Sequence, residues 1–275
     1  MFEIANSILG YDLLKLCLNG PKKELDKTAI CQPAVLVSSL AAVEKLKVEN
    51  LQAIENCVSA AGFIITFEDA IKLVKVRAEV MQASSEAIPS GMMSVFCTHK
   101  TKLRLAMEVS QEVCKQKHGI NNPICHVANY LYPDCKVIAG HEQALEFIAQ
   151  NSKDFGIKRT KRLAVSGAFH TNLMQDGLPD FTNALKKVEF QPPSIPVFSN
   201  VKAERYSNSN QEFLKLLRMH LIKPVKWEQI MHILYSRKKG EKFPHTYEVG
   251  PGKQLGTLLR MVNVKAFENY HNVEI

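Results

Sequence analysis

The sequence predicts an α/β protein with one larger body and an inserted ferredoxin-like subdomain. Between residues 92 and 163, short strand-like and helix-like segments follow one another in the order β-α-β-β-α-β, which is the order of the ferredoxin-like motif. On both sides of this region, helix-like segments alternate with single apolar strand-like runs, and 275 residues suffice for a large domain with a smaller one inside it. We therefore assign residues 1–91 and 164–275 to the larger α/β body and residues 92–163 to the subdomain.

Hydrophobic periodicity, caps and Gly or Pro breaks define the expected elements in order. Before the subdomain we expect helices at 3–18, 28–46 and 67–85 and a buried strand at 54–61. Within the subdomain we expect strands at 92–96, twice within 124–138 and at 162–165, and helices at 103–114 and 141–155. After it we expect helices at 178–188, 211–221, 227–237 and 254–261, and strands at 196–200 and 246–249.

Composition excludes several classes of protein. No apolar run approaches the roughly 20 residues that span a bilayer, so we expect no membrane partner. The net charge is +8, but the basic clusters at 158–162 and 237–242 lack interleaved aromatic residues, so we expect no nucleic-acid partner. These clusters are either solvated faces or docking points for an anionic partner. Seven scattered cysteines without a Cys-x-x-Cys pair predict a reducing compartment and no zinc site.

His170 ends the apolar run that begins at Leu163 and precedes a helix-like segment. A histidine placed at the end of a strand can serve as a general base. It can equally be a hydrogen-bonded structural residue. The spacing alone leaves both interpretations open.

Arg77 lies on the apolar face of the helix expected at 67–85, close to Val74 and Met81. An arginine side chain keeps its proton, so a buried arginine needs an anionic partner, and its planar fork suits a carboxylate. That carboxylate belongs either to an internal Asp or Glu or to an acidic substrate. The helical pattern does not choose between the two.

Seven short motifs carry a resemblance to a known family. They are Gln32-Pro-Ala, Arg77-Ala-Glu-Val-Met-Gln82, Ser90-Gly-Met, Val165-Ser-Gly-Ala-Phe-His170, Ser199-Asn-Val, Pro224-Val-Lys-Trp227 and Glu248-Val-Gly-Pro-Gly252. In this order they resemble the malonyl-CoA:acyl-carrier-protein transacylases, and the animal mitochondrial form most closely. The resemblance covers nearly the whole chain.

The resemblance implies a fold and an activity. The body would be a hydrolase-like, mostly parallel sheet flanked by helices. The enzyme would move malonyl from coenzyme A to the phosphopantetheine thiol of acyl carrier protein through a malonyl-serine intermediate, for fatty acid synthesis. It would need no metal and no cofactor beyond the coenzyme A thioester that is its substrate. We expect a monomer in the mitochondrial matrix, although the residues after Met1 have the composition of neither a signal nor a transit peptide.

The resemblance also implies roles for individual residues. His170 matches the general base, and Arg77 matches the arginine that pairs with the malonyl carboxylate. Met81 falls where the family lines the substrate pocket, and Asn200 lies in a segment near the site. Lys226 occupies the position at which some relatives have a glutamine whose backbone carbonyl orients the histidine.

Two parts of the family pattern are absent from the sequence. The Gly-Gln-Gly segment that contributes to the oxyanion hole is not found. The nucleophile elbow, Gly-x-Ser-x-Gly-Glu, should follow the strand that ends at Ala61, but the sequence continues Gly-Phe-Ile-Ile-Thr66. About a dozen residues are therefore expected to be missing, among them the serine and its oxyanion donor.

Three residues near this point are poor substitutes for the serine. Ser59 and Cys57 lie in the expected buried strand, and Thr66 is expected to cap the next helix. Two hypotheses follow: either a transacylase gene product has lost its elbow, or the chain is a non-catalytic protein that binds malonyl-CoA or acyl carrier protein. A generic esterase fits less well, because the position of Arg77 favours an anionic acyl group.

Overall fold

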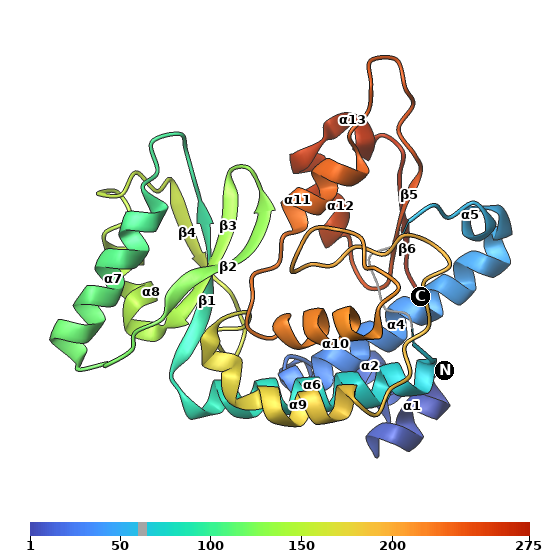
Figure 1. Cartoon of the computed structure of the whole chain (residues 1–275), viewed down its shortest axis with the longest axis horizontal. Coiled ribbons are helices and arrows are strands. Elements are labelled where there is room, and N and C mark those ends of the chain that lie inside the picture. The colour runs from blue at the N-terminus through green and yellow to red at the C-terminus, as the bar shows by residue number, and fades with distance from the viewer. Residues whose placement is uncertain (60–64) are drawn as a thin grey trace.

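The computed structural model describes residues 1–59 and 65–275. Figure 1 shows a four-stranded sheet with two helices beside a larger, mostly helical part built from both ends of the chain. The first part contains β1 (Ser90–Phe96), α7 (Leu103–His118), β2 (Cys125–Tyr132), β3 (Cys135–His141), α8 (Glu142–Gln150) and β4 (Arg159–Arg162). The larger part begins with α1 (Phe2–Leu9), α2 (Leu13–Asn19), α3 (Lys22–Leu25), α4 (Thr28–Glu49), α5 (Leu51–Glu55) and α6 (Phe67–Ala87). It continues with η1 (Asn172–Gly177), α9 (Leu178–Leu185), α10 (Asn210–Met219), α11 (Trp227–Leu234), β5 (Thr246–Val249), α12 (Gln254–Val262), α13 (Val264–Phe267) and β6 (Tyr270–Val273).

The four-stranded sheet has the strand order β2-β3-β1-β4, and every pairing in it is antiparallel. Both faces of β1 are covered. Met93 and Val95 pack with α7 and α8 on one face, and Met92 packs on the other face against Ala168, in the segment that leads to His170. Side chains of a strand alternate between its faces, so β1 joins two cores and holds this segment against the sheet.

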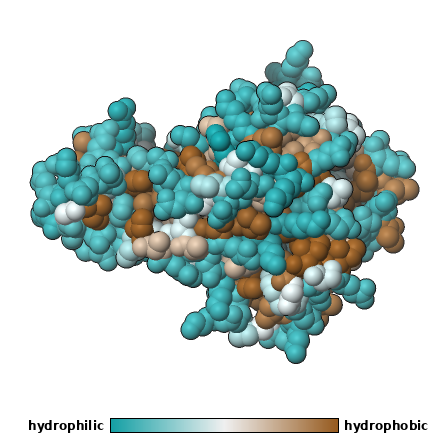
Figure 2. All heavy atoms as spheres, turned by 60° about the horizontal axis from the view of Figure 1, so that its bottom comes forward, coloured by the Kyte–Doolittle hydropathy of each residue, from teal (hydrophilic) through white to brown (hydrophobic). Residues whose placement is uncertain are grey.

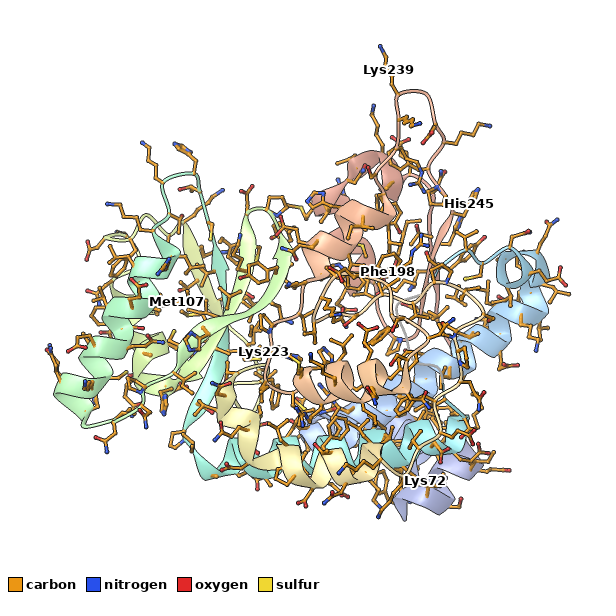
Figure 3. The ribbon with its side chains drawn as sticks, viewed as in Figure 1. Lys72, Met107, Phe198, Lys223, Lys239 and His245 are labelled. Carbon is orange, nitrogen blue, oxygen red and sulfur yellow. The ribbon has the colours of Figure 1, made fainter. Side chains whose placement is uncertain are left out.

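The segment before α11 also ties the sheet to the helical part. The backbone N–H and C=O groups of Val225 pair with Ala128 (2.8 Å) and Tyr130 (2.9 Å) of β2. Lys223, two residues earlier, lies between the sheet and α10 in Figure 3. Residues 220–226 are therefore fixed at both ends, by α10 and by β2.

Local sequence signals explain two helix boundaries. The Thr66 hydroxyl accepts a hydrogen bond from the backbone N–H of Asp69 at 3.2 Å, which confirms the predicted start of α6. The helix expected at 3–18 is instead two helices. Gly10 ends α1 with a left-handed φ of 83°, and the Asp12 side chain caps α2.

The prediction that no segment is long and apolar enough to cross a membrane is wrong for α4. This helix has 22 residues and a window with a mean hydropathy of 1.3, so by length and composition alone it could span a bilayer. In the structure, however, α4 packs along α6, and its Val37 shares a core with Ile71. A third of this window is buried in the structure.

The sheet part and the helical part differ in how hydrophobic their surfaces are (Figure 2). In Figure 2 the projecting sheet part is mostly hydrophilic, whereas apolar atoms gather over the helical part. Exposed apolar side chains of α1 and α2 include Ile4, Leu14 and Leu18.

The expected mostly parallel sheet of the body differs from what the described residues form. Within 1–59 and 65–275, parallel pairing is limited to β5 with β6 and to a bridge between Asn129 and Val225. The run expected as a strand at 54–61 begins inside helix α5, and its last two residues lie outside the described part of the chain. The run at 196–200 is not a strand in the described residues, where Phe198 forms an isolated bridge with Arg205, and the strand expected at 162–165 ends at Arg162. A short apolar run does not distinguish a buried strand from other buried backbone, which explains these errors.

Glu248 of the Glu-Val-Gly-Pro-Gly motif holds the C-terminal elements together. Its buried carboxylate accepts hydrogen bonds from the backbone N–H groups of Leu255 (3.0 Å) and Gly256 (2.7 Å) and from the Tyr270 hydroxyl (2.6 Å). One carboxylate thus joins β5, the first turn of α12 and β6. The glutamate of this motif therefore has a structural role.

We expect Glu248→Gln to lower the free energy of unfolding by about 2–3 kcal/mol, because an amide loses the charge and turns an N–H group toward backbone donors. Urea denaturation measures this change. Glu268→Gln, at an exposed position of the same region, is the matched control and should change stability by less than about 0.5 kcal/mol. Equal effects of the two substitutions would contradict this role of Glu248.

Candidate active site

His170 lies in the irregular segment after β4, and its φ of 61° places it in the left-handed region. A non-glycine residue adopts that conformation only where surrounding contacts hold it. Here the Nδ1 atom is 2.8 Å from the backbone oxygen of His220. A carbonyl only accepts hydrogen bonds, so Nδ1 carries the proton and Nε2 keeps its lone pair. In this tautomer the ring has the form that a general base requires.

The carbonyl that orients His170 is therefore that of His220, and the expectation for Lys226 is wrong. The Lys226 backbone oxygen accepts a hydrogen bond from Ile230 at 3.2 Å, inside the first turn of α11. The Lys226 carbonyl, which the motif suggested as the partner of His170, therefore forms a helical hydrogen bond instead. The position six residues earlier, just after α10, faces the histidine instead.

The surroundings of His170 keep its ring neutral. Burial lowers its pKa to about 4, and the positive charge of Arg77 acts in the same direction, whereas the hydrogen bond to the His220 carbonyl opposes the shift. Near neutral pH the Nε2 atom carries a lone pair that can accept a proton, and in the described residues no hydrogen bond occupies it. The two predicted site residues both lie close to His220: Arg77 lines a cavity with it, and the His220 ring centroid is 4.9 Å from that of His170.

Arg77 lies on α6, and its guanidinium group is surrounded by protein. Burial lowers its pKa to about 10, so it still carries its charge at neutral pH. The guanidinium donates a hydrogen bond to the Gln32 side-chain oxygen on α4. Within residues 1–59 and 65–275, no carboxylate lies within ion-pair distance of it. An arginine in this environment can bind an anion, because its charge has only a neutral partner there.

Gln32 also connects Arg77 to Met81. Its amide nitrogen lies 3.5 Å from the Met81 sulfur, one helical turn beyond Arg77, and Met81 is almost fully buried. Residues four apart on a helix share one face, so Arg77 and Met81 both face α4. Gln32 thus fixes the direction of the arginine side chain.

Asn200 is less directly connected to this group. Its backbone oxygen accepts a hydrogen bond from the Lys226 backbone N–H at 2.8 Å, and its side-chain oxygen is buried without a partner in the described part of the chain. No hydrogen bond among the described residues joins Asn200 to His170 or Arg77. The structure thus gives Asn200 a contact with the segment that carries His220.

The sequence did not indicate His220. It follows α10 without a motif of its own, but its ring centroid lies 4.9 Å from that of His170, and it lines a cavity together with Arg77. Its Nε2 atom is buried and has no hydrogen-bond partner in 1–59 or 65–275. Burial holds the pKa of His220 well below its ordinary value, and the nearby His170 and Arg77 lower it further. Arg77, His170 and His220 therefore form one part-buried cluster.

None of the three candidate substitute nucleophiles bonds to His170. The Thr66 hydroxyl caps α6, and the Cys57 thiol points to the backbone oxygen of Ser59 at 3.4 Å. In the described residues, the only hydrogen bond of the His170 side chain is the one to His220. The position expected for the serine elbow, after Ala61, lies outside the described residues.

Curated relatives place the chain in a family, although no protein-family model matches it. It is 48% identical over 287 positions to the human mitochondrial malonyl-CoA-acyl carrier protein transacylase, a match that covers 100% of this chain and 73% of the relative. The chain belongs to the malonyl-CoA-acyl carrier protein transacylase family. The Drosophila melanogaster mitochondrial member is 47% identical (99% and 75% covered), and the Escherichia coli K12 member is 31% identical (95% and 83% covered).

Solved transacylase structures share the fold. The Clostridium perfringens enzyme has a TM-score of 0.82 at 28% identity, with 99% of this chain and 84% of that one covered. A malonyl-transacylase solved in complex with a type II polyketide acyl carrier protein has a TM-score of 0.78 at 26% identity, with 100% and 86% covered. These matches confirm the α/β class and the family resemblance, but they do not test the roles of individual residues.

Proposed function

We propose that this protein is a malonyl-CoA:acyl-carrier-protein S-malonyltransferase that feeds fatty acid synthesis in the mitochondrial matrix. One observation carries the proposal: Arg77, which has no carboxylate partner in the described residues, lines a cavity with His220, whose ring centroid lies 4.9 Å from that of His170. The His170 ring is neutral, and in the same residues its Nε2 has no hydrogen-bond partner. An anionic acyl group bound to Arg77 would lie next to that base. The names of the mitochondrial relatives support both the activity and the compartment.

The proposed roles follow from this geometry. Arg77 binds the malonyl carboxylate, Met81 borders the acyl group through its contact with Gln32, and Asn200 steadies the segment around Lys226. In the family reaction, His170 takes the proton of a serine hydroxyl whose oxygen attacks the thioester carbonyl. The coenzyme A thiolate then leaves and takes up the proton from the histidine. The carrier thiol reverses these steps, so no metal is required.

We also propose that this chain lacks the serine elbow. The matches with the human and mouse relatives extend over 287 positions, 12 more than the 275 residues of this chain. That difference agrees with the dozen residues expected to be missing after Ala61. In that case other members of the family catalyse the reaction, whereas this chain retains the general base His170 and Arg77 but not the nucleophile.

The division into domains remains our proposal. The element order and the strand order β2-β3-β1-β4 support a ferredoxin-like subdomain at 92–163, inserted into a body of 1–91 and 164–275. The cluster of Arg77, His170 and His220 belongs wholly to this body. We propose a monomer that binds acyl carrier protein, and a relative solved in complex with its acyl carrier protein supports this partner.

Ligand selectivity tests the function. We expect malonyl-CoA to bind more tightly than acetyl-CoA, by about fivefold to a hundredfold, because a neutral acetyl group leaves the buried guanidinium without an anion. Calorimetry with both ligands measures this ratio. Arg77→Met should abolish the preference, whereas Arg104→Met, at an exposed arginine of α7, should retain it. Equal affinities in the unaltered protein would refute the role of Arg77.

A further inference from the structure

A cavity of about 60 Å³ adjoins Arg77 and lies among α4, α6, α9 and α10. Its wall is apolar except at Arg77 and His220, and its other lining residues are Leu36, Ile65, Ala70, Leu73, Val74, Phe181, Leu185 and Leu217. The three lining residues of α6 other than Arg77 precede it in the helix, whereas Met81 follows it by one turn. The cavity therefore lies toward the N-terminal end of α6 from Arg77, whereas Met81 lies toward the C-terminal end.

The polar end of the cavity has two unused hydrogen-bond groups. The guanidinium has five N–H donors, and in the described residues its only side-chain partner is the Gln32 oxygen. The Nε2 atom of His220 is buried and has no partner in the same residues. A buried polar atom that is left unpaired is costly, so a ligand that satisfies both groups would be stabilised there.

The volume limits the size of the apolar part of a ligand. An engineered apolar cavity of about 150 Å³ holds benzene, which has six carbon atoms. By that scale, a cavity of about 60 Å³ accommodates about two or three carbon atoms. A wall of leucine, valine and phenylalanine side chains would exclude a second charged group.

We infer that this cavity binds a short-chain monocarboxylic acid such as butyrate, with the carboxylate on Arg77 and the Nε2–H of His220 and the alkyl tail among Leu73, Leu185 and Leu217. This ligand class goes beyond the malonyl thioester of the proposed function, because its tail is apolar and carries no coenzyme A. Acetate fills too little of the cavity. Octanoate is too long for it.

Calorimetric titration of the full chain with butyrate, acetate, octanoate and butyramide tests this inference. Butyrate should bind in the millimolar range and at least about tenfold more tightly than butyramide, which has the same shape without the charge. Arg77→Met and His220→Phe should each weaken butyrate binding. Arg104→Met is the control for loss of a positive charge elsewhere.

Two cavity-filling variants test the position of the tail. Leu217→Phe should weaken butyrate binding by about tenfold, because the larger ring occupies the space of the alkyl chain. If this variant does not fold, as judged by circular dichroism, Val74→Leu serves the same purpose from α6. Unchanged butyrate affinity in a folded variant would overturn the inference, as would equal binding of butyrate and butyramide.

Malonyl-CoA binding to the unaltered chain, measured in parallel, separates this inference from the proposed function. If malonyl-CoA binds and butyrate does not, the cavity inference alone is wrong. If neither binds, Arg77 is not an anion site and both are wrong.

Discussion

Incubation with malonyl-CoA should leave the mass of this chain unchanged. In serine acyl transfer the histidine acts only on a hydroxyl within hydrogen-bond reach, and the described residues offer His170 no such hydroxyl. In a well-studied serine protease, loss of the nucleophile alone lowers kcat by about a millionfold. Intact-mass spectrometry after incubation therefore should show no malonyl adduct.

Restoring the elbow provides the positive control. A Gly-x-Ser-x-Gly-Glu segment with its helix, inserted after Phe63, should produce an adduct, and the same insertion with Ala in place of Ser should not. An adduct on Cys57, Ser59 or Thr66 of the unaltered chain would show that the elbow had been misread. Peptide mapping would identify the modified residue.

Stability should decline in mild acid because of His170. Its pKa is about 4 in the folded protein, below the ordinary value of 6.5. Below pH 6.5 the unfolded chain therefore binds a proton that the folded chain excludes, so the free energy of unfolding falls as the pH falls from 6.5 to 4. The loss from this one group is on the order of 3 kcal/mol. His220, whose pKa is shifted in the same direction, adds to it.

Urea unfolding at several pH values between 7 and 4 measures this loss. His170→Gln should reduce the slope of stability against pH, because glutamine does not titrate. His118→Gln, at an exposed histidine at the end of α7, should leave the slope unchanged. If the slope of stability against pH were equal in the unaltered protein and both variants, groups other than His170 would cause the acid sensitivity.

The sequence by itself determined the features that depend on neighbouring residues. The start of α6 follows from the Thr66 cap, and the position of Arg77 on the same helix face as Leu73 and Val74 follows from helical periodicity, because caps and faces act over three or four residues. The ordered motifs also identified the family, since their order along the chain needs no structure. Where the local signal was ambiguous, as in the apolar run at 54–61, the prediction of a strand was wrong.

Only the tertiary structure decided which groups meet in the site. His170 receives its orientation from a carbonyl 50 residues away, and Arg77 is held by Gln32, 45 residues before it. No motif indicated that His220 rather than Lys226 would supply that carbonyl. The choice depends on where α10 ends and α11 begins, and on the pairing of Val225 with β2. Such contacts arise from the packing of distant segments, which periodicity and motif spacing do not encode.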